Sequence, residues 1–469
     1  MKISTKKILS TIVLVTGIFF ALNAQTNVSG GIFANTTWTL AGSPYIVIDT
    51  TVVFPGVTLT IEPGVVVKFD DNMYLEIRQA TLISIGTATD SITFTSNSSS
   101  PSRGIWGHAN NGGIWLNGNP TPAAFNFCNI KYATRSVGGG TIQYLKNSSF
   151  TNNEYGFYNI SFPVDSCAFK SNDIGISSLS NVTLNFCSIS NNNFGVESSG
   201  NNVILNNCTI NSNSLGFGGA TGQTAGTKFY GCRISHNNTG VTTHSFAGNV
   251  FRDCIINYNT SLGIASYPIM GIDSIINCEI KFNGTGVTAQ SSSGCVITQC
   301  EFEYDTIGIV IKNSSADIYC NKICNNISYG LKMDVSTNFN VSNNYWCTTD
   351  STQIAAAIYD GYDNVAVGLV TFLPLDSLCY TSTGITAYEA QPASFSIFPN
   401  PAADDITIEL PANSSKAEIK IYNMPGQLIY SSRLTKQKTT IDISAFRKGA
   451  YIIQIATADA ISRQKLIRQ

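Results

Sequence analysis

Three glutamates and one lysine occupy matching places in successive repeats of the chain. Glu279 and Glu301 each directly follow a cysteine, and Lys281 and Glu303 each stand three residues after one. Carboxylates on neighbouring strands repel one another, which raises the pKa of one of them, and a carboxyl group with a raised pKa suits a general acid. These four residues are therefore the catalytic candidates of the chain.

Aromatic side chains accompany these charges at the fourth residue after each cysteine. That place holds His236, Tyr258, Phe282 and Tyr304 in four successive repeats. Aromatic faces stack on pyranose rings, and charged side chains orient sugar hydroxyls or perform acid/base work. We therefore expect a ladder of rings beside the charges, with ligand contacts from Tyr258, Phe282, Tyr304, Arg233 and Asp305.

An alternative interpretation of the same residues is structural. Lys281 would lie between the carboxylates and form cross-strand ion pairs worth less than ~1 kcal/mol each, while the aromatic rings shield a corner of the fold. The histidines His108, His236 and His244 have no partner at metal-ligand spacing, so they are interpreted as surface or turn residues and no metal site is expected. The stretch "DGYDN" at 360–364 would suit calcium, but paired turn-capping aspartates are the preferred interpretation, so no cofactor is expected.

A repeat positions these residues. Its cysteines are Cys167, Cys187, Cys208, Cys232, Cys254, Cys278 and Cys300, separated by 20, 21, 24, 22, 24 and 22 residues. Around each lies a motif of Cys, any residue, Ile or Phe, any two residues, Asn, any two residues, Gly and an apolar residue, as in "CSISNNNFGV" and "CEIKFNGTGV". Imperfect copies cover residues 128–331. Such a period is the signature of a solenoid, in which each coil contacts its neighbours.

Each coil of about 21 residues contains three short apolar runs, which predicts three short strands per coil. Alternation along a strand sends the cysteine and the Ile or Phe two places later inward, while the first and third residues after the cysteine face solvent. The Asn five places after the cysteine falls at a corner, where stacked amides can hydrogen-bond one another, and the Gly is expected to make the next bend.

The cysteines have three interpretations. In-register residues of adjacent coils lie ~4.8 Å apart, whereas a relaxed disulfide needs β-carbons ~3.8 Å apart, so buried free thiols are favoured for the column. A linear stack does not supply tetrahedral zinc ligands, which disfavours metal binding. Disulfides remain open, above all for the cysteines outside the column, Cys295, Cys324, Cys347 and Cys379.

The solenoid resembles the right-handed parallel β-helix proteins of secreted bacterial type, which share the pectate-lyase fold. The segment "PYIVIDTTVVFPGVTLTIEPGVVVKF" is similar to the start of such a helix and "NNYWCTTDSTQIAAAIYDGYDNVAVGLVTFLPL" to its end. The resemblance implies an all-β right-handed parallel β-helix over residues 25–385, with an end cap over 340–380. Within the cap, "STQIAAAIYD" predicts a short helix that begins on a Ser/Thr cap and places Ile354 and Ile358 on one face.

The tail has a different composition. Alternating segments such as "DDITIEL", "AEIKIYN" and "AYIIQIA", split by turn signals, predict a small antiparallel, Ig-like sandwich over residues 395–469 after a linker over 386–394. The tail closely resembles the type A C-terminal sorting domain of the Bacteroidetes type IX secretion system. The resemblance implies a partner, the secretion machinery, and a sorting signal at Gly449, Tyr451, Lys465, Leu466, Ile467, Arg468 and Gln469.

The start of the chain and its overall charge predict where the protein is located and which partners it lacks. A lysine-bearing start, a short apolar run and Ala24 predict a signal peptide over residues 1–24, and no transmembrane anchor is expected. Charged residues make up 12% of the chain and the net charge is -2, which gives no footprint for nucleic acid. We expect a monomer that is secreted or attached to the outer-membrane surface.

Two classes of function stay open at this stage. The first is a non-catalytic protein whose long face binds a polysaccharide or another surface glycan. The second is a polysaccharide lyase, glycoside hydrolase or epimerase that acts on the same face. The polygalacturonase and pectate lyase signatures are absent from the sequence, which favours the first class.

Overall fold

The structure is a computed structural model that describes residues 25–198, 202–218, 226–243, 248–267, 272–290, 294–312, 316–376, 379, 395–410, 417–423, 428–434, 436–456 and 461–469. The expected signal peptide, the expected linker and His244 lie outside the described residues. The chain divides into two compact units, Met1–Tyr380 and Thr381–Gln469. Each unit is described by itself.

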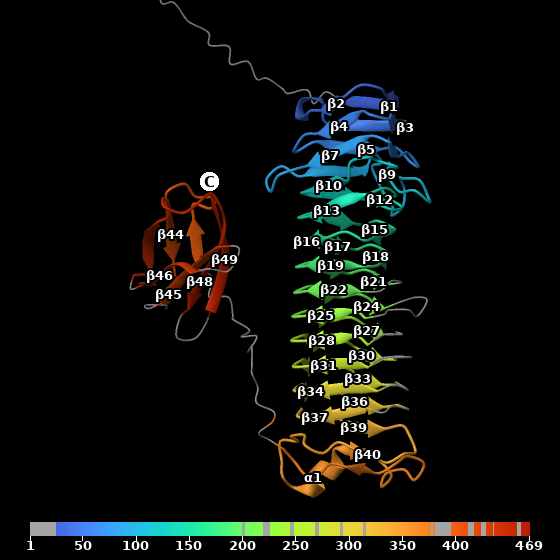
Figure 1. The fold of residues 1–469 in the computed structure, drawn as a ribbon, viewed down its shortest axis with the longest axis vertical. Coiled ribbons are helices and arrows are strands. Elements are labelled where there is room, and N and C mark those ends of the chain that lie inside the picture. Colours follow the sequence, from blue (N-terminus) through green and yellow to red (C-terminus); the bar gives the residue numbers. More distant parts are fainter. Residues whose placement is uncertain are drawn as a thin grey trace, which may run out of the picture. The chain divides into compact units, whose positions relative to one another are not determined.

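The first unit is a right-handed parallel β-helix whose coils stack along one axis (Figure 1). Each coil contributes one strand to the second of its three long sheets, which makes about 13 coils. The second sheet consists of β2 (Thr36–Trp38), β4 (Thr58–Ile61), β7 (Thr81–Ile85), β10 (Ala123–Asn126), β13 (Ile142–Lys146), β16 (Val164–Asp165), β19 (Val182–Asn185), β22 (Val203–Asn206), β25 (Lys228–Tyr230), β28 (Val250–Arg252), β31 (Asp273–Ile276), β34 (Cys295–Thr298) and β37 (Ala316–Tyr319).

The other two long sheets flank the second along the same axis. The first sheet consists of β1 (Thr26–Ile32), β3 (Tyr45–Val53), β5 (Val66–Phe69), β6 (Leu75–Arg78), β8 (Ile92–Ser96), β9 (Ile114–Asn117), β11 (Cys128–Lys131), β12 (Val137–Gly138), β14 (Ser149–Thr151), β17 (Ala168–Lys170), β20 (Ser188–Ser190), β23 (Thr209–Asn211), β26 (Arg233–Ser235), β29 (Ile255–Asn257), β32 (Glu279–Lys281), β35 (Glu301–Glu303) and β38 (Lys322–Cys324). The third consists of β15 (Tyr155–Ile160), β18 (Ile174–Leu179), β21 (Phe194–Glu197), β24 (Leu215–Gly218), β27 (Thr239–Thr243), β30 (Leu262–Ser266), β33 (Thr285–Ala289), β36 (Ile307–Ile311), β39 (Tyr329–Met333) and β41 (Ile358–Tyr359).

The interior of the solenoid follows the predicted alternation. The column cysteines are buried, and the apolar residues two places later, such as Ile189, Ile210 and Ile234, have no exposed surface. Among the described residues, nine cysteines are free and all nine are buried, including Cys295. The expectation of buried free thiols in the column is confirmed. These thiols act as small apolar groups that line the bore.

Burial also shields these thiols from bulky reagents. The pKa of Cys128 is raised to about 12 because the thiolate would be removed from water. A bulky maleimide is therefore expected to modify essentially none of the nine free cysteines in the folded protein and all of them in denaturant. Mass spectrometry of the labelled protein measures this, and rapid labelling of the folded Cys187 to Cys300 column would contradict it.

Stacked asparagines form a buried ladder at the corner between the first and third sheets. Asn172 Oδ1 accepts hydrogen bonds from the backbone N of Asn153 at 2.9 Å and from its Nδ2 at 3.1 Å, while Asn172 Nδ2 donates to the Phe150 carbonyl at 3.0 Å. The same pattern continues through Asn192, Asn213, Asn237, Asn259 and Asn283. The predicted amide ladder is confirmed.

The repeat glycine does not make the bend that follows this corner, so that expectation is wrong. The residue that directly follows each first-sheet strand from β14 to β38 has positive φ, between 52° and 59°, from Asn152 through Asn325. The glycines instead lie inside strands of the third sheet. There a β-carbon on Gly240 would lie 2.4 Å from the carbonyl oxygen of Gly263 on the next coil. Glycine is required because the coils approach too closely for a side chain.

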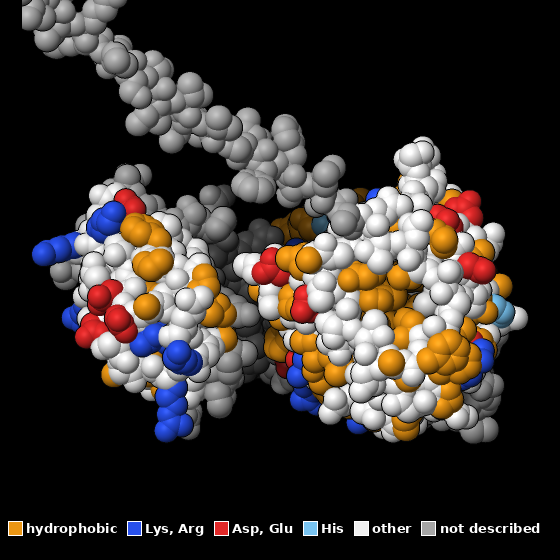
Figure 2. Space-filling model, turned by 90° about the horizontal axis from the view of Figure 1, so that it is seen from above, with side chains coloured by type: hydrophobic (Ala, Val, Ile, Leu, Met, Phe, Trp, Pro, Cys, Tyr) orange, Lys and Arg blue, Asp and Glu red, His pale blue; other side chains and the backbone are white. Residues whose placement is uncertain are grey.

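The two ends of the solenoid differ. The first coil, which includes the 3-10 helix η1 (Leu40–Gly42), exposes Phe33, Leu40 and Ile48. Figure 2 looks onto this end and shows apolar side chains between polar ones. The last coils are covered by a cap that contains α1 (Ser351–Ala356), β40 (Phe339–Asn340) and β42 (Val370–Thr371).

The cap agrees with the sequence only in part. The helix begins after Asp350, whose carboxylate accepts a hydrogen bond from the backbone N of Thr352, so the cap residue is not Ser or Thr. Ile354 is buried on the helix, whereas Ile358 is buried in β41, which pairs with β39 and continues the third sheet. Disulfides join Cys320 to Cys379 and Cys324 to Cys347.

The second unit contains two antiparallel sheets around one apolar core. One consists of β43 (Ser396–Phe398), β44 (Asp405–Glu409) and β47 (Lys438–Asp442). The other consists of β46 (Leu428–Leu434), β45 (Ala417–Asn423), β48 (Gly449–Ala456) and β49 (Ile461–Arg468). The predicted small antiparallel β domain is confirmed.

Candidate functional site

The predicted charges lie together on the outer face of the first sheet. Parallel pairing places Glu279 opposite Glu301 and Lys281 opposite Glu303 on strands β32 and β35. The next strand, β38, places Lys322 opposite Glu301. Sequence reasoning missed Lys322 because it aligned this coil on Cys320, whereas the strand register places Asn321 at the position of Cys300. Aligning Ile323 with the buried Phe302 would have revealed it.

Two lysines neutralise the carboxylates. Lys281 Nζ lies 2.8 Å from Glu301, 3.2 Å from Glu303 and 4.0 Å from Glu279. Lys322 Nζ lies 2.5 Å from Glu301 and 2.7 Å from Glu303. Glu303 therefore points outward yet stays buried beneath both lysines. The cluster is an ion-pair network, as the structural interpretation predicted.

This network reverses the expected electrostatics. Burial works to raise the pKa of Glu301, but hydrogen bonds from Lys281 and Lys322 outweigh it and hold that pKa below its ordinary value. Burial works to lower the pKa of both lysines, and their carboxylate partners raise it instead. The prediction that repulsion raises the pKa of a glutamate is wrong at Glu301, because Lys322 adds a second positive charge. At neutral pH Glu301 carries no proton to donate, and neither lysine accepts one.

The predicted aromatic ladder is present beside this network. Ring centroids lie 5.0 Å apart for His236 and Tyr258, 4.8 Å for Tyr258 and Phe282, and 5.1 Å for Phe282 and Tyr304. The planes of Tyr258 and Phe282 differ by only 3°. Both faces of these two rings are thus covered by neighbouring rings. A sugar would meet ring edges there rather than ring faces.

The backbone beneath the ladder makes its composition informative. His236, Tyr258, Phe282 and Tyr304 have φ between 55° and 59°, a conformation that disfavours bulky residues by roughly 1–2 kcal/mol. Other coils place short polar residues such as Asn191, Ser212 and Asn325 at the same position. Ring stacking offsets part of the conformational cost. The bend itself does not require aromatic residues.

The remaining two predicted ligand residues differ in accessibility. Arg233 is half-buried on the outer face of β26, directly before the ladder. Asp305 has no exposed surface, because it replaces an asparagine of the buried ladder and accepts hydrogen bonds from Asn283. A ligand on the outer face cannot reach Asp305, which corrects the expectation for this residue.

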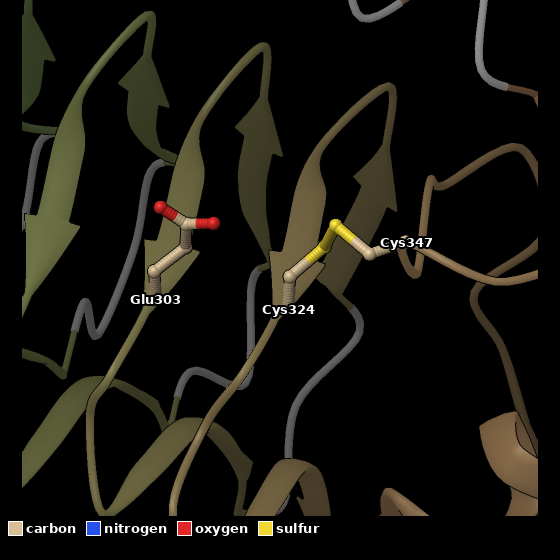
Figure 3. Close-up of side chains that lie close together, drawn as sticks. All are labelled: Glu303, Cys324 and Cys347. Atoms are coloured by element: carbon tan, nitrogen blue, oxygen red, sulfur yellow. A yellow bond between two sulfur atoms is a disulfide. The ribbon is translucent and has the colours of Figure 1, made fainter.

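Two groups near the end of the solenoid have the composition of metal sites. Glu303, Cys324 and Cys347 place their ligand atoms within 4.8 Å of one another (Figure 3). Cys324 and Cys347 are joined as a disulfide, so neither offers a thiolate. In "DGYDN", Asp360 accepts from the backbone N of Tyr362 at 2.9 Å and of Val370 at 2.8 Å, which confirms its turn-capping role.

The residues predicted for sorting lie in the last two strands of the second unit. Tyr451 and Leu466 are paired across β48 and β49 and are both buried. Gly449 pairs with Arg468, whose guanidinium lies 3.2 Å from Asp404. Lys465 and Ile467 belong to β49, and the backbone N of Gln469 donates to the Ala402 carbonyl at 2.9 Å. These residues lie on β48, on the edge strand β49 and directly after it, at one edge of the four-stranded sheet.

Comparison with known proteins assigns both units. Residues 396–469 match a family described as a secretion system C-terminal sorting domain, and residues 146–268 match one described as a right handed beta helix region. The described residues contain no helix with the length and apolar character needed to cross a membrane.

Similar proteins include two curated enzymes and a solved structure. Ulvan lyase NLR42 of Nonlabens ulvanivorans is 34% identical over 88 residues, which cover 18% of this chain and 16% of the lyase. Beta-agarase D of Zobellia galactanivorans is 26% identical over 162 residues, which cover 31% of this chain and 32% of the agarase. The matches thus span less than two thirds of both relatives. The crystal structure of the periplasmic alginate epimerase AlgG matches with 10% identity and a TM-score of 0.32, covering 71% of this chain and 75% of the epimerase.

The family matches agree with the coils of the first unit and the antiparallel sheets of the second. A sorting domain of this kind directs its chain through the type IX machinery to the outside of the cell or its outer-membrane surface. The chain is a right-handed parallel β-helix protein with a type IX secretion C-terminal sorting domain.

Proposed function

We propose that the outer face around β26, β29, β32 and β35 binds an extended glycan without cleaving it. The observation that carries the proposal is the exposed ladder of His236, Tyr258, Phe282 and Tyr304. Four successive coils place bulky rings where the backbone favours short polar residues. A conformational cost retained at one surface is typical of a functional site.

The charges beside the ladder support binding over catalysis. Glu301 and Glu303 each accept contacts from both lysines, and the pKa of Glu301 lies below its ordinary value. General acid catalysis needs a carboxyl group that holds a proton near neutral pH. The ion-pair network instead presents fixed charges that orient hydroxyl groups.

A second candidate is a polysaccharide lyase, glycoside hydrolase or epimerase acting on the same face. It is favoured by the names of the two curated relatives, an ulvan lyase and an agarase, whose matches cover small parts of either chain. Under this alternative, Glu279, Glu301, Glu303 and Lys281 are the residues that would perform the chemistry.

A glycan array followed by product analysis tests the proposal. The full chain should bind polysaccharides from a panel that includes ulvan, agarose and alginate, and should release no reducing ends or unsaturated products. Tyr304→Ala is expected to weaken binding about tenfold, because the contact between this ring and the glycan is lost. That contact is worth about 1.4 kcal/mol of binding free energy. Tyr319→Ala is the matched control, since Tyr319 is 42% exposed on the second sheet and Tyr304 is 43% exposed.

Two results would overturn the proposal. Equal binding by wild type and Tyr304→Ala would show that the aromatic ladder does not contact the glycan. Product release that disappears in Glu301→Gln, with the thermal unfolding midpoint unchanged, would establish the enzyme instead.

A further inference from the structure

A pocket lies away from the aromatic ladder, near the start of the regular coils. It has a volume of about 410 Å³ and is lined by residues that include Asn110, Arg135, Gly139, Tyr158, Asn159 and Ser161. These residues come from two neighbouring coils and from the loop before β9. The pocket therefore opens where the chain turns from one coil to the next.

Arg135 is the charged residue that lines this pocket. Its guanidinium lies 4.2 Å from the ring centroid of Tyr158 and 5.4 Å from that of Tyr155. Its Nη1 donates to the Asn110 carbonyl at 2.6 Å, which also fixes the group in place. The loop that carries Asn110 is itself held, because His108 Nδ1 accepts from the backbone N of Asn110 and Asn111 at 3.2 Å.

The charge of Arg135 is not neutralised by a protein group. Within the described part of the chain, no carboxylate lies within ion-pair distance of its guanidinium. Its Nε is buried and has no hydrogen-bond acceptor. A guanidinium offers five N–H donors in a planar fork that matches carboxylate and sulfate oxygens, and the protein uses one of them here. A half-buried guanidinium with unused donors can bind an anion.

The residues around Arg135 are of the kind that bind a sugar rather than a small inorganic ion. Gly139 and Gly140 are exposed and leave one wall without side chains, and the aromatic residues Phe157, Tyr158 and Phe162 line the pocket. Apolar rings beside one fixed charge form a common arrangement for holding a charged sugar.

We propose that this pocket binds the carboxylate or sulfate group of an acidic sugar through Arg135. The site is separate from the aromatic ladder. Five strand pairings, from β11 through β26, lie between the two sites, which corresponds to about 24 Å along the axis.

Ligand-observed NMR on the full chain tests the proposal with small probes that need no other part of the face. The probes are D-glucuronate, D-galactose 6-sulfate and neutral D-galactose. Saturation transfer is expected for at least one charged probe and not for the neutral one, and comparison of the two charged probes identifies the preferred anion. Binding should weaken as salt is added, because the contact is electrostatic.

Variants separate this pocket from general surface charge. Arg135→Gln is expected to reduce affinity at least about tenfold, as loss of a charge-assisted hydrogen bond predicts. Arg252→Gln removes the same charge from the exposed side of β28 and should bind like wild type. Asn159→Asp places a carboxylate at the pocket without removing Arg135 and should also reduce affinity at least about tenfold, because it repels the anionic probe.

Asn159→Asp also guards against a folding defect, because Asn159 is exposed and aspartate tolerates its positive φ. The proposal fails if the neutral sugar binds equally well, if Arg135→Gln and Asn159→Asp both bind like wild type, or if Arg252→Gln loses as much affinity as Arg135→Gln. Failure of the pocket proposal would not contradict the proposed glycan site at the aromatic ladder, since Tyr304→Ala tests that site alone.

Discussion

Replacing Gly240 by alanine is expected to lower the free energy of unfolding by about 3 kcal/mol or more. The new β-carbon would lie 2.4 Å from the carbonyl oxygen of Gly263, 3.2 Å from Ile234 Cγ2 and 3.3 Å from Asn259 Cγ. All three contacts belong to the rigid interior, so the coils would have to separate locally. Overpacking of this kind typically costs 1–3 kcal/mol, and a backbone obstacle places the change at the upper end. Chemical denaturation followed by circular dichroism measures the shift.

Thr239→Ala is the matched control for this substitution. Thr239 precedes Gly240 in β27 and is half-buried, so truncation removes atoms without creating a clash. Its unfolding midpoint should fall much less than that of Gly240→Ala. Equal midpoints for the two variants would mean that the glycine column does not set the spacing of the coils.

Asp305→Asn is expected to stabilise the solenoid, and to do so more at high pH. Burial raises the pKa of Asp305 to about 8, and the hydrogen bonds from Asn283 and the nearby charge of Lys281 lower it only in part. Its Oδ1 accepts from Asn283, whereas its Oδ2 is buried without a partner. An amide in this place would restore the donor that every neighbouring asparagine supplies.

The direction of the pH dependence follows from linkage. In the unfolded chain the pKa of Asp305 returns to about 3.8, so the folded chain binds this proton more tightly. The stabilising contribution of the protonated carboxyl is complete below about pH 4 and is lost as the pH rises through about 8. Asparagine does not titrate, so the advantage of the variant should grow from pH 5 to pH 9.

The expected gain at pH 9 is about 1–3 kcal/mol, the usual cost of a buried polar group without a partner. Denaturation midpoints of both proteins across this pH range measure it. Asp317→Asn serves as the control, because Asp317 is exposed on β37. Parallel pH profiles for wild type and Asp305→Asn would contradict the assignment of a neutral carboxyl in the ladder.

The coil interior was predictable from sequence because it depends on short-range patterns. Alternation along a strand places Cys187 and Ile189 on one side, and a regular period repeats that choice in every coil. The amide ladder follows for the same reason, since Asn172 and Asn192 occupy the same place in successive coils. The role of the glycines did not follow. A sequence shows that Gly240 is small, but only the distance between coils shows what excludes a side chain.

The sequence predicted which aromatic and charged residues lie together in the candidate site, but not the direction of the pKa shift at Glu301. Tyr258, Phe282 and Tyr304 were brought together by the period alone. Lys322 was missed because Cys320, on which the repeat was aligned, lies one residue before the column position that Asn321 occupies. That one lysine helps to reverse the direction of the pKa change at Glu301. The disulfide of Cys320 was missed because Cys379 lies 59 residues away in the cap, beyond the reach of any period.

The stacking of whole coils also fixes distance in discrete steps. Each coil advances the chain by one strand spacing of about 4.8 Å, so equivalent positions in two coils are separated along the axis by a whole number of such steps. The spacing between the Arg135 pocket and the His236 end of the ladder is therefore countable along the sequence. A gene duplication or deletion of one coil would lengthen or shorten that spacing by one step and leave both sites intact. The number of coils between two sites on the solenoid therefore sets their separation along its axis.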